Sequence, residues 1–140
     1  MFIFEKVRES AAVIERGNTI LLVREPNSEK WSLPGGTAKP EEGARETLIR
    51  GLAEEFLGLR ICGSPELFRH FSPSIINPRE VTIFLLGIAG EAVPNPQKLE
   101  EARWVDSSLI EENYSVPEEA ILSLTSLRKM RDRSPPKIIA

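Results

Sequence analysis

The sequence predicts a mixed α/β (α+β) fold, in which a mixed sheet packs against one helix in the middle of the chain and another near its end. Two β-rich runs, at residues 10–14 and 19–23, flank a Gly-Asn turn, which is typical of an antiparallel hairpin. Residues 81–88 form a near-continuous apolar run, which is typical of a strand buried on both faces. Apolar residues at helical spacing between these runs, and again near the C-terminus, predict the two helices.

The remaining elements are short and are separated by polar or proline-containing loops. We expect brief strands at 60–62, 66–71 and 102–105, with a helical turn at 106–108. The C-terminal helix is predicted over 116–131, and residues 132–140 are expected to be a frayed tail.

Length and composition are those of a single domain over residues 1–140. Hydrophobic residues make up 41% of the chain, which is enough for a core. The net charge of -3 argues against a nucleic-acid partner and means that an anionic substrate needs local cations or a metal. The single cysteine allows no intrachain disulfide and favours a reducing cytoplasm. No apolar run has the length of a membrane span, and the first residues do not form a convincing signal peptide.

The helix that follows Glu42 divides into two arcs on a helical wheel. The arc expected to face the core holds Leu48, Ile49, Leu52, Ala53 and Phe56. The opposite arc, expected to face solvent, holds Thr47, Arg50, Gly51, Glu54 and Glu55. Gly58 is expected to stop the helix in a left-handed conformation.

Glu54 and Glu55 are adjacent carboxylates on this open face, and they repel each other unless a cation lies between them. Hard divalent ions such as Mg²⁺ take oxygen ligands and commonly bridge to substrate phosphates. Gly35 and Gly36 let the backbone approach closely and offer a carbonyl as another oxygen ligand. Glu42 lies at the loop-to-helix junction, where a carboxylate favours the helix N-terminus.

The spacing of these residues closely resembles the signature of the Nudix hydrolases. That signature is a Gly, five residues, a Glu, seven residues, Arg-Glu, an aliphatic residue, any residue, Glu-Glu, any residue, Gly and an aliphatic residue. Within residues 36–58 the matching positions are Gly36, Glu42, Arg50, Leu52, Glu54 and Glu55. Gly51 replaces the Glu after the Arg, and Leu57-Gly58 stand where the family has Gly and then an aliphatic residue. The flanking layout also fits, so the resemblance implies the Nudix α/β/α sandwich with a mixed central sheet.

The resemblance implies a MutT-like pyrophosphohydrolase that cleaves a nucleoside diphosphate derivative, of nucleotide or nucleotide-sugar type, by attack of water on phosphorus. The expected cofactor is Mg²⁺ or Mn²⁺, bound by Glu54, Glu55 and the Gly36 carbonyl. In the family the matching Arg orients the neighbouring Glu, which is absent here. Arg50 is therefore expected to pair with Glu46 or Glu54 one turn away, and Glu54 is our candidate for the general base.

Gly51 makes the activity the open question, because the equivalent Glu of the family is a metal ligand or the general base. The family often supplies a further acid from the segment that holds Lys98, Glu100 and Glu101 here; Lys98 in that position would weaken catalysis, and solvation explains the two acids more simply. We expect Gly51→Glu to raise Mg²⁺-dependent turnover. The alternatives are a Nudix-fold module that binds a nucleotide without cleaving it and an interaction protein unrelated to phosphates.

The other candidate residues are expected to have structural or recognition roles. His70, the only histidine, is more simply structural than catalytic, and Cys62 is most simply a small core residue. The loops at 25–30 and 72–79 are expected to recognise the base and the leaving group. An edge strand at residues 2–4 could pair with a second copy to form a homodimer or with its own sheet, and the sequence leaves both open.

Overall fold

The computed structural model describes residues 6–132, so the strand start expected at 2–4 and almost all of the expected tail lie outside the described residues. The strands are β1 (Val7–Arg16), β2 (Thr19–Arg24), β3 (Trp31–Ser32), β4 (Gly35–Thr37), β5 (Phe56–Leu57), β6 (Arg60–Phe71), β7 (Arg79–Ala89), β8 (Val93–Pro94) and β9 (Glu101–Asp106). The helices are α1 (Ala44–Glu55), the short 3-10 helix η1 (Ser107–Leu109), α2 (Ile110–Asn113) and α3 (Glu118–Asp132). No described helix is long and apolar enough to cross a membrane.

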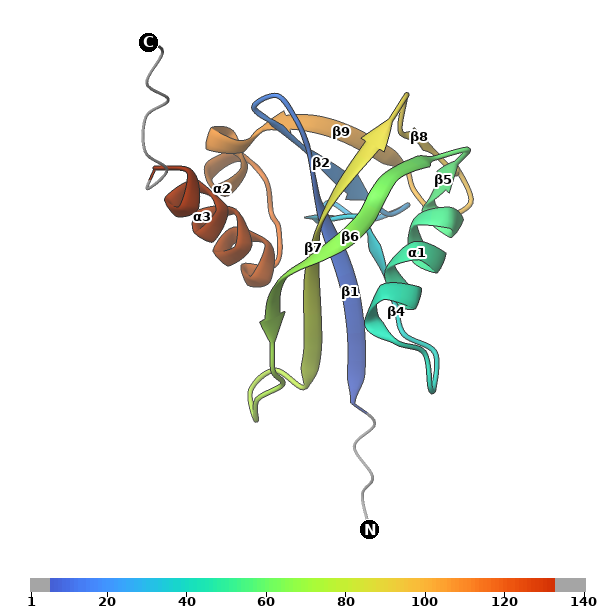
Figure 1. Ribbon diagram of the computed structural model, residues 1–140, viewed down its shortest axis with the longest axis vertical. Coiled ribbons are helices and arrows are strands. Elements are labelled where there is room, and N and C mark those ends of the chain that lie inside the picture. Colours follow the sequence, from blue (N-terminus) through green and yellow to red (C-terminus); the bar gives the residue numbers. More distant parts are fainter. Residues whose placement is uncertain (1–5, 133–140) are drawn as a thin grey trace.

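One mixed sheet forms the centre of the molecule, and helices cover both of its faces. Its strands follow the order β3-β2-β1-β7-β6, with β4 paired to β1 and β9 paired to β2. Figure 1 shows α1 on one side of the central strands and α2 and α3 on the other. The predicted α/β/α sandwich with a mixed sheet is therefore confirmed.

The predicted N-terminal hairpin is present. Strands β1 and β2 pair antiparallel, with Glu15 opposite Ile20 and Arg16 opposite Thr19. Gly17 in the turn has a φ of 59°, a left-handed conformation that glycine adopts without a steric cost. Each strand of the hairpin pairs with two further strands: β1 with β4 and β7, and β2 with β3 and β9.

Strand β7 contains the apolar run predicted to be buried on both faces. It pairs in parallel with β1 and antiparallel with β6, which is what makes the sheet mixed. Because alternate side chains of a strand point to opposite faces, β7 contributes to two cores. Val81 and Ile83 belong to one, and Phe84 and Leu86 belong to the other.

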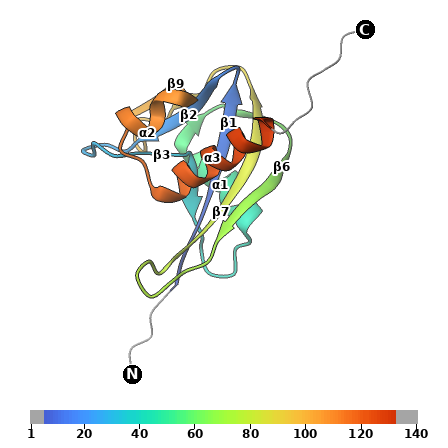
Figure 2. The ribbon, with the colours of Figure 1, turned by 90° about the vertical axis from the view of Figure 1, so that its left-hand side faces the viewer.

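Each core is closed by a different helix. On one face, α3 supplies Ala120, Leu124 and Leu127, and Figure 2 shows this helix lying across the sheet. On the opposite face, α1 supplies Leu48 and Leu52, which are almost completely buried. This arrangement leaves the C-terminal end of α1 and the start of α3 free to border a cleft.

The wheel predicted the buried face of α1 only in part. Ile49 is 44% exposed and Ala53 is exposed, although both were expected to face the core. Thr47 and Gly51 are buried, although both were expected to face solvent. The reason is that α1 has two neighbours: the sheet, which takes the leucines, and strand β4, which covers the Thr47 and Gly51 side.

Three other local expectations are corrected. The strands expected at 60–62 and 66–71 are one strand, β6, whose register shifts against β7 between Cys62 and Glu66. Cys62 is an exposed free thiol on this strand and not a core residue, because β6 is the last strand of the sheet and turns one face to solvent. Gly58 has a φ of 68°, but it follows β5, and α1 has already ended at Glu55.

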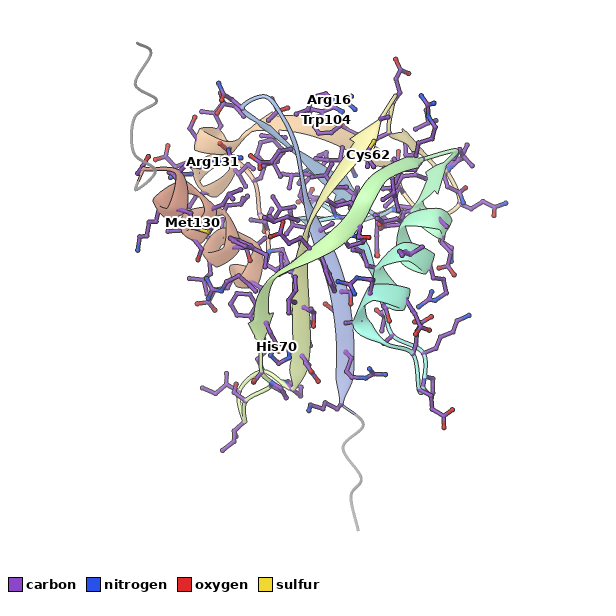
Figure 3. The ribbon with its side chains drawn as sticks, viewed as in Figure 1. Arg16, Cys62, His70, Trp104, Met130 and Arg131 are labelled. Carbon is purple, nitrogen blue, oxygen red and sulfur yellow. The ribbon has the colours of Figure 1, made fainter. Side chains whose placement is uncertain are left out.

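His70 lies at the far end of β6, away from α1 (Figure 3). Its Nε2 is 2.8 Å from Oε1 of Glu80 on the neighbouring strand. The structural role expected for this histidine agrees with that pairing.

Candidate active site

Close backbone contact between α1 and β4 explains the glycine at position 51. A Cβ atom at this position would lie 2.6 Å from the carbonyl oxygen of Gly35 and 2.8 Å from the Cα of Gly36. In the same way, a Cβ on Gly36 would lie 3.0 Å from the Cα of Gly51. Real Cβ atoms do not approach backbone atoms at 2.6 Å, so a side chain at 51 requires the helix and the strand to separate.

This contact removes the basis for expecting Gly51→Glu to raise turnover. The wheel treated position 51 as an open surface on which a carboxylate could complete a three-acid cluster. In the fold the position is buried against β4, and even the first carbon of a glutamate side chain meets Gly35. A glutamate at position 51 would therefore require this turn of α1 to move away from β4.

Arg50 joins the loop before α1 to the helix itself. Its Nε donates to Oε2 of Glu42 and its Nη2 to Oε1, each at 2.8 Å, a bidentate pair that fixes both side chains. Its Nη1 also donates to Oε1 of Glu54 at 3.1 Å, and its Nη2 donates to the Thr37 carbonyl at 2.6 Å. Of the two expected partners the structure shows Glu54, while Glu42 takes the place of Glu46.

The hydrogen bonds from Arg50 lower the pKa of Glu42 to about 2, and the same pairing raises the pKa of Arg50. Glu42 also accepts hydrogen bonds from the Lys39 N–H at 3.1 Å and the Thr47 hydroxyl at 2.9 Å. This carboxylate is saturated by the protein, so we assign it to holding the loop and not to binding a cation.

Glu55 has the opposite environment. Its Oε1 accepts a hydrogen bond from the Gly35 N–H at 2.8 Å. The pKa of Glu55 is raised to about 7, chiefly by burial and to a smaller extent by the negative charges of Glu25 and Glu54, although the Gly35 hydrogen bond acts in the opposite direction. A buried carboxylate without a counter-ion is a group that a cation would stabilise.

Glu55 opens onto a cleft of about 630 Å³. The cleft is bordered by strands β1, β3, β4 and β7, by the end of α1 and by the start of α3. Both segments expected to recognise substrate contribute to its walls: Glu25, Ser28 and Lys30 come from the first, and only Arg79, its last residue and the first of β7, comes from the second. A volume of this size is in the range of small-molecule sites.

Acidic groups outnumber basic groups in the walls of the cleft. The charged side chains that line it are Glu9, Glu25, Lys30, Glu55, Arg79 and Glu119. Arg79 is already paired with Glu9, since its Nη2 lies 2.5 Å from Oε2 of that carboxylate. A diphosphate entering this cleft therefore meets a negative field unless a cation accompanies it.

The structure separates the residues that the sequence grouped together. Gly36 and Glu55 line the cleft, whereas Glu54 and Arg50 are not among its lining residues. The side chain of Glu54 is 44% exposed and is paired with Arg50. The two neighbouring acids thus diverge, one into the cleft and one toward the arginine.

The charged residues of the segment after β8 do not add an acid to the cleft. Glu101 forms an ion pair with Arg103 at 2.5 Å and another with Arg24 at 3.5 Å. Glu100 is exposed, as expected of a solvated acid, and Lys98 is an exposed residue of the turn that begins at Asn95. None of the three lines the cleft.

Sequence reasoning missed two features that shape the site. Asn95 caps the end of α1, because its N–H donates to the Glu55 carbonyl at 2.7 Å and its Nδ2 donates to the Glu54 carbonyl at 2.9 Å. Glu119 and Arg79 meet at the start of α3, where the shortest distance between their charged groups is 4.0 Å. The asparagine between two prolines was the one signal for the first; no local signal exists for the second.

The cleft suits a hard divalent ion that substrate oxygens help to bind. Within residues 6–132, no group of three or more His, Cys, Asp or Glu side chains is arranged to hold a metal by itself. Mg²⁺, however, is commonly held by one or two carboxylates together with substrate phosphates. The buried carboxylate of Glu55 and the backbone of the glycine turn provide oxygen donors of that kind.

The sandwich fold and the spacing of Gly36, Arg50 and the two glutamates define a hydrolase that acts on phosphoanhydride bonds. The chain belongs to the Nudix family, since the model of the NUDIX domain matches residues 6–123. Members of this family act on nucleoside diphosphate derivatives. Among curated proteins, no sequence matches this chain.

Solved structures show the same fold. A nudix hydrolase family member from Chromobacterium violaceum is 24% identical, with a TM-score of 0.71 over 95% of this chain and 84% of that one. The MutT protein of Methanosarcina mazei Go1 is 19% identical, with a TM-score of 0.68 over 91% and 96% of the two chains. An ADP-ribose pyrophosphatase from Streptococcus suis is 19% identical, with a TM-score of 0.65 over 89% and 93%.

Proposed function

We propose that this chain is a Mg²⁺- or Mn²⁺-dependent pyrophosphohydrolase that cleaves a nucleoside diphosphate linked to another group. The observation that supports the proposal most is Glu55, a largely buried carboxylate at the edge of an acidic cleft that adjoins the glycine turn at Gly36. The role of the protein is to hold Glu55 ready for a cation, since no salt bridge joins Glu55 to a positive side chain among residues 6–132.

The electrostatics of the cleft favour a reaction that needs a cation. A bound divalent ion would neutralise the diphosphate and lower the pKa of the attacking water. Glu55 would be a ligand together with the Gly36 carbonyl, and the Gly35 N–H would keep the Glu55 side chain oriented. Arg50 is a positioning residue in this proposal, because its hydrogen bonds hold the glycine loop against α1.

Glu54 stays a candidate for the general base and for a metal ligand. It is adjacent to Glu55 in the chain, but its Oε1 is 3.1 Å from Nη1 of Arg50. To reach the cleft, the Glu54 carboxylate would have to exchange this contact for the substrate or the ion. Single Glu54→Gln and Glu55→Gln variants therefore distinguish the roles of the two acids, which the sequence alone could not distinguish.

The direct test is a substrate panel of nucleoside triphosphates, dinucleotides and nucleotide sugars, with ADP-ribose included because one structural neighbour bears that activity in its name. Each compound is incubated with Mg²⁺, Mn²⁺ or EDTA, and products are separated by anion-exchange chromatography. We expect a nucleoside monophosphate from at least one compound, only with metal, and its loss in Glu55→Gln. Metal-dependent turnover that survives Glu54→Gln and Glu55→Gln together would refute the proposal.

The close contact at Gly51 favours a second candidate, a Nudix-fold module that binds a nucleotide without cleaving it. At position 51 the family has an essential acid, whereas this chain has a glycine whose backbone packs against Gly35 and Gly36. Calorimetric titration and turnover on one preparation decide between the two functions. Binding of a nucleotide with metal but without product identifies the module, and product formation identifies the enzyme.

The setting of the protein is also a proposal. The exposed thiol of Cys62 agrees with the reducing cytoplasm expected from the sequence. Pairing of residues 2–4 between two copies stays a prediction, and sedimentation of the full chain against a variant lacking those residues tests it.

A further inference from the structure

The cleft needs a second carboxylate if Glu55 is to hold a divalent ion there, and neither expected source supplies it. Position 51 has no side chain, and Glu54 is bound to Arg50. We propose that Glu25, in the loop between β2 and β3, is this second carboxylate. The inference depends on the proposed function and deepens it by naming a residue outside the signature.

Geometry is the first support for Glu25. It lines the same cleft as Glu55, Gly35 and Gly36, although it lies on a different element and about thirty residues earlier in the chain. Strands β3 and β4 and helix α1 separate the two acids in sequence, and residues of both strands line the same cleft. The cleft therefore has one carboxylate at the end of α1 and another on the loop that borders it.

The loop that carries Glu25 is held in place by the residue before it. The guanidinium of Arg24 donates to the Ser28 carbonyl at 2.9 Å, and the Ser28 N–H donates to the Glu25 carbonyl at 3.3 Å. Arg24 also lies over the ring of Trp31 at 5.5 Å and pairs with Glu101 at 3.5 Å. The loop is thus closed on itself and fastened to two strands, so the Glu25 side chain starts from a fixed backbone.

These contacts give Glu101 an indirect role. The sequence identified its segment as one in which the family places an additional acid. Here Glu101 contacts Arg24 instead of the cleft, and Arg24 holds the loop that presents Glu25. Glu101 is therefore a positioning residue for an acid supplied from elsewhere.

The position of Glu54 also favours Glu25. Glu25 and Glu55 line the same cleft, in which acidic side chains outnumber basic ones, whereas Glu54 does not line it and is paired with Arg50. Two carboxylates in one cleft are the arrangement that a divalent ion stabilises. The cleft therefore brings Glu25, and not Glu54, into the same space as Glu55.

The test is a titration of the full chain with Mn²⁺ at pH 8, with free Mn²⁺ followed by its electron paramagnetic resonance signal. The variants are Glu25→Gln, Glu54→Gln and Glu55→Gln, with Glu29→Gln as the matched control. Glu29 is on the same loop, carries the same charge and is exposed like Glu25, but it does not line the cleft. Circular dichroism confirms that each variant is folded.

We expect Glu25→Gln and Glu55→Gln each to raise the Kd for Mn²⁺ by about tenfold or more, since loss of even an outer partner of a metal ligand costs that much. Glu29→Gln should change it by less than about twofold, because an exposed charge outside the cleft is screened. Glu25→Asp, which keeps the charge, should restore part of the affinity.

The outcomes separate this inference from the proposed function. If Glu55→Gln weakens Mn²⁺ binding and Glu25→Gln does not, the role of Glu25 is wrong and the proposed function stands. If Glu54→Gln weakens binding in place of Glu25→Gln, the second acid is the one that the signature predicted. If the wild-type chain binds no Mn²⁺, or if Glu55→Gln leaves the Kd unchanged, both the inference and the proposed metal site fail.

Discussion

Replacing Glu55 with glutamine should stabilise the fold at pH 8 and at the same time weaken metal binding. Burial raises the pKa of this carboxyl from 4.5 to about 7. Between those values the folded chain keeps a proton that the unfolded chain has lost, so the fold loses stability as pH rises through this window. The shift corresponds to about 3 kcal/mol of destabilisation above pH 7, as an order of magnitude.

Glutamine has no charge to bury, and its amide oxygen can still accept the Gly35 N–H. Urea unfolding of both proteins in EDTA, at several pH values from 4.5 to 8.5, measures the difference. We expect the free energies of unfolding to agree near pH 4.5 and the variant to be more stable by about 3 kcal/mol at pH 8. Taking the difference between the two proteins removes the contribution of every other titrating group.

Glu54→Gln is the matched control, since this neighbouring carboxylate is 44% exposed and paired with Arg50. Loss of such a pair should cost about 0–1 kcal/mol. A constant difference between wild type and Glu55→Gln across the pH range would refute the reasoning, because it would show that Glu55 is not perturbed by burial. When EDTA is replaced by excess Mg²⁺, we expect the free energy of unfolding of the wild type to rise, because a ligand that binds the native state stabilises it. The Glu55→Gln variant should not gain this stability.

Three further perturbations follow from the contacts around α1. Gly51→Ala should lower the free energy of unfolding by about 1–3 kcal/mol, because the added methyl group overpacks the contact with Gly35. Helix propensity alone would instead raise it by ~1 kcal/mol. Urea unfolding measures the change, and a stabilised variant would contradict the contact with Gly35. Glu42→Gln should be less stable than the wild type above pH 4.5, because Arg50 lowers the pKa of Glu42 to about 2 in the folded chain. The wild type should lose this advantage as pH falls from 4.5 toward 2, and acid unfolding followed by circular dichroism measures it. Asn95→Ala should destabilise the chain by about 0.5–1.5 kcal/mol, because the Glu54 carbonyl loses its Nδ2 donor while the backbone N–H at position 95 still caps the Glu55 carbonyl; an unchanged urea midpoint would show that water replaces the lost donor.

Much of the fold could be predicted from local pattern. The Gly-Asn turn required a hairpin because glycine alone accepts the left-handed backbone at Gly17 without a steric cost. The apolar run in β7 had to be buried on both faces, and its alternating side chains fill both cores. These features depend on neighbours in sequence, so a single sequence is enough to predict them.

The candidate site was predicted less completely, because its residues come together across the chain. The spacing of Gly36, Arg50, Glu54 and Glu55 identified the family and the segment. It could not distinguish the two glutamates, since only the cleft decides which of them is buried. It also gave no reason to connect Glu25 with Glu55, because no periodic pattern joins a loop to a helix end thirty residues later.

The amino-acid sequence by itself determined the hairpin, the doubly buried strand, the order of the two long helices, the family, and the presence of acids and glycines at a signature spacing. The tertiary structure decided which of these groups share a space. A helical wheel treats every polar position as open to solvent, whereas α1 has a second neighbour in β4 and packs Gly51 against its backbone. Burial and electrostatic environment arise from groups distant in sequence, and for that reason only the folded chain shows that Glu55 faces the cleft and Glu54 does not.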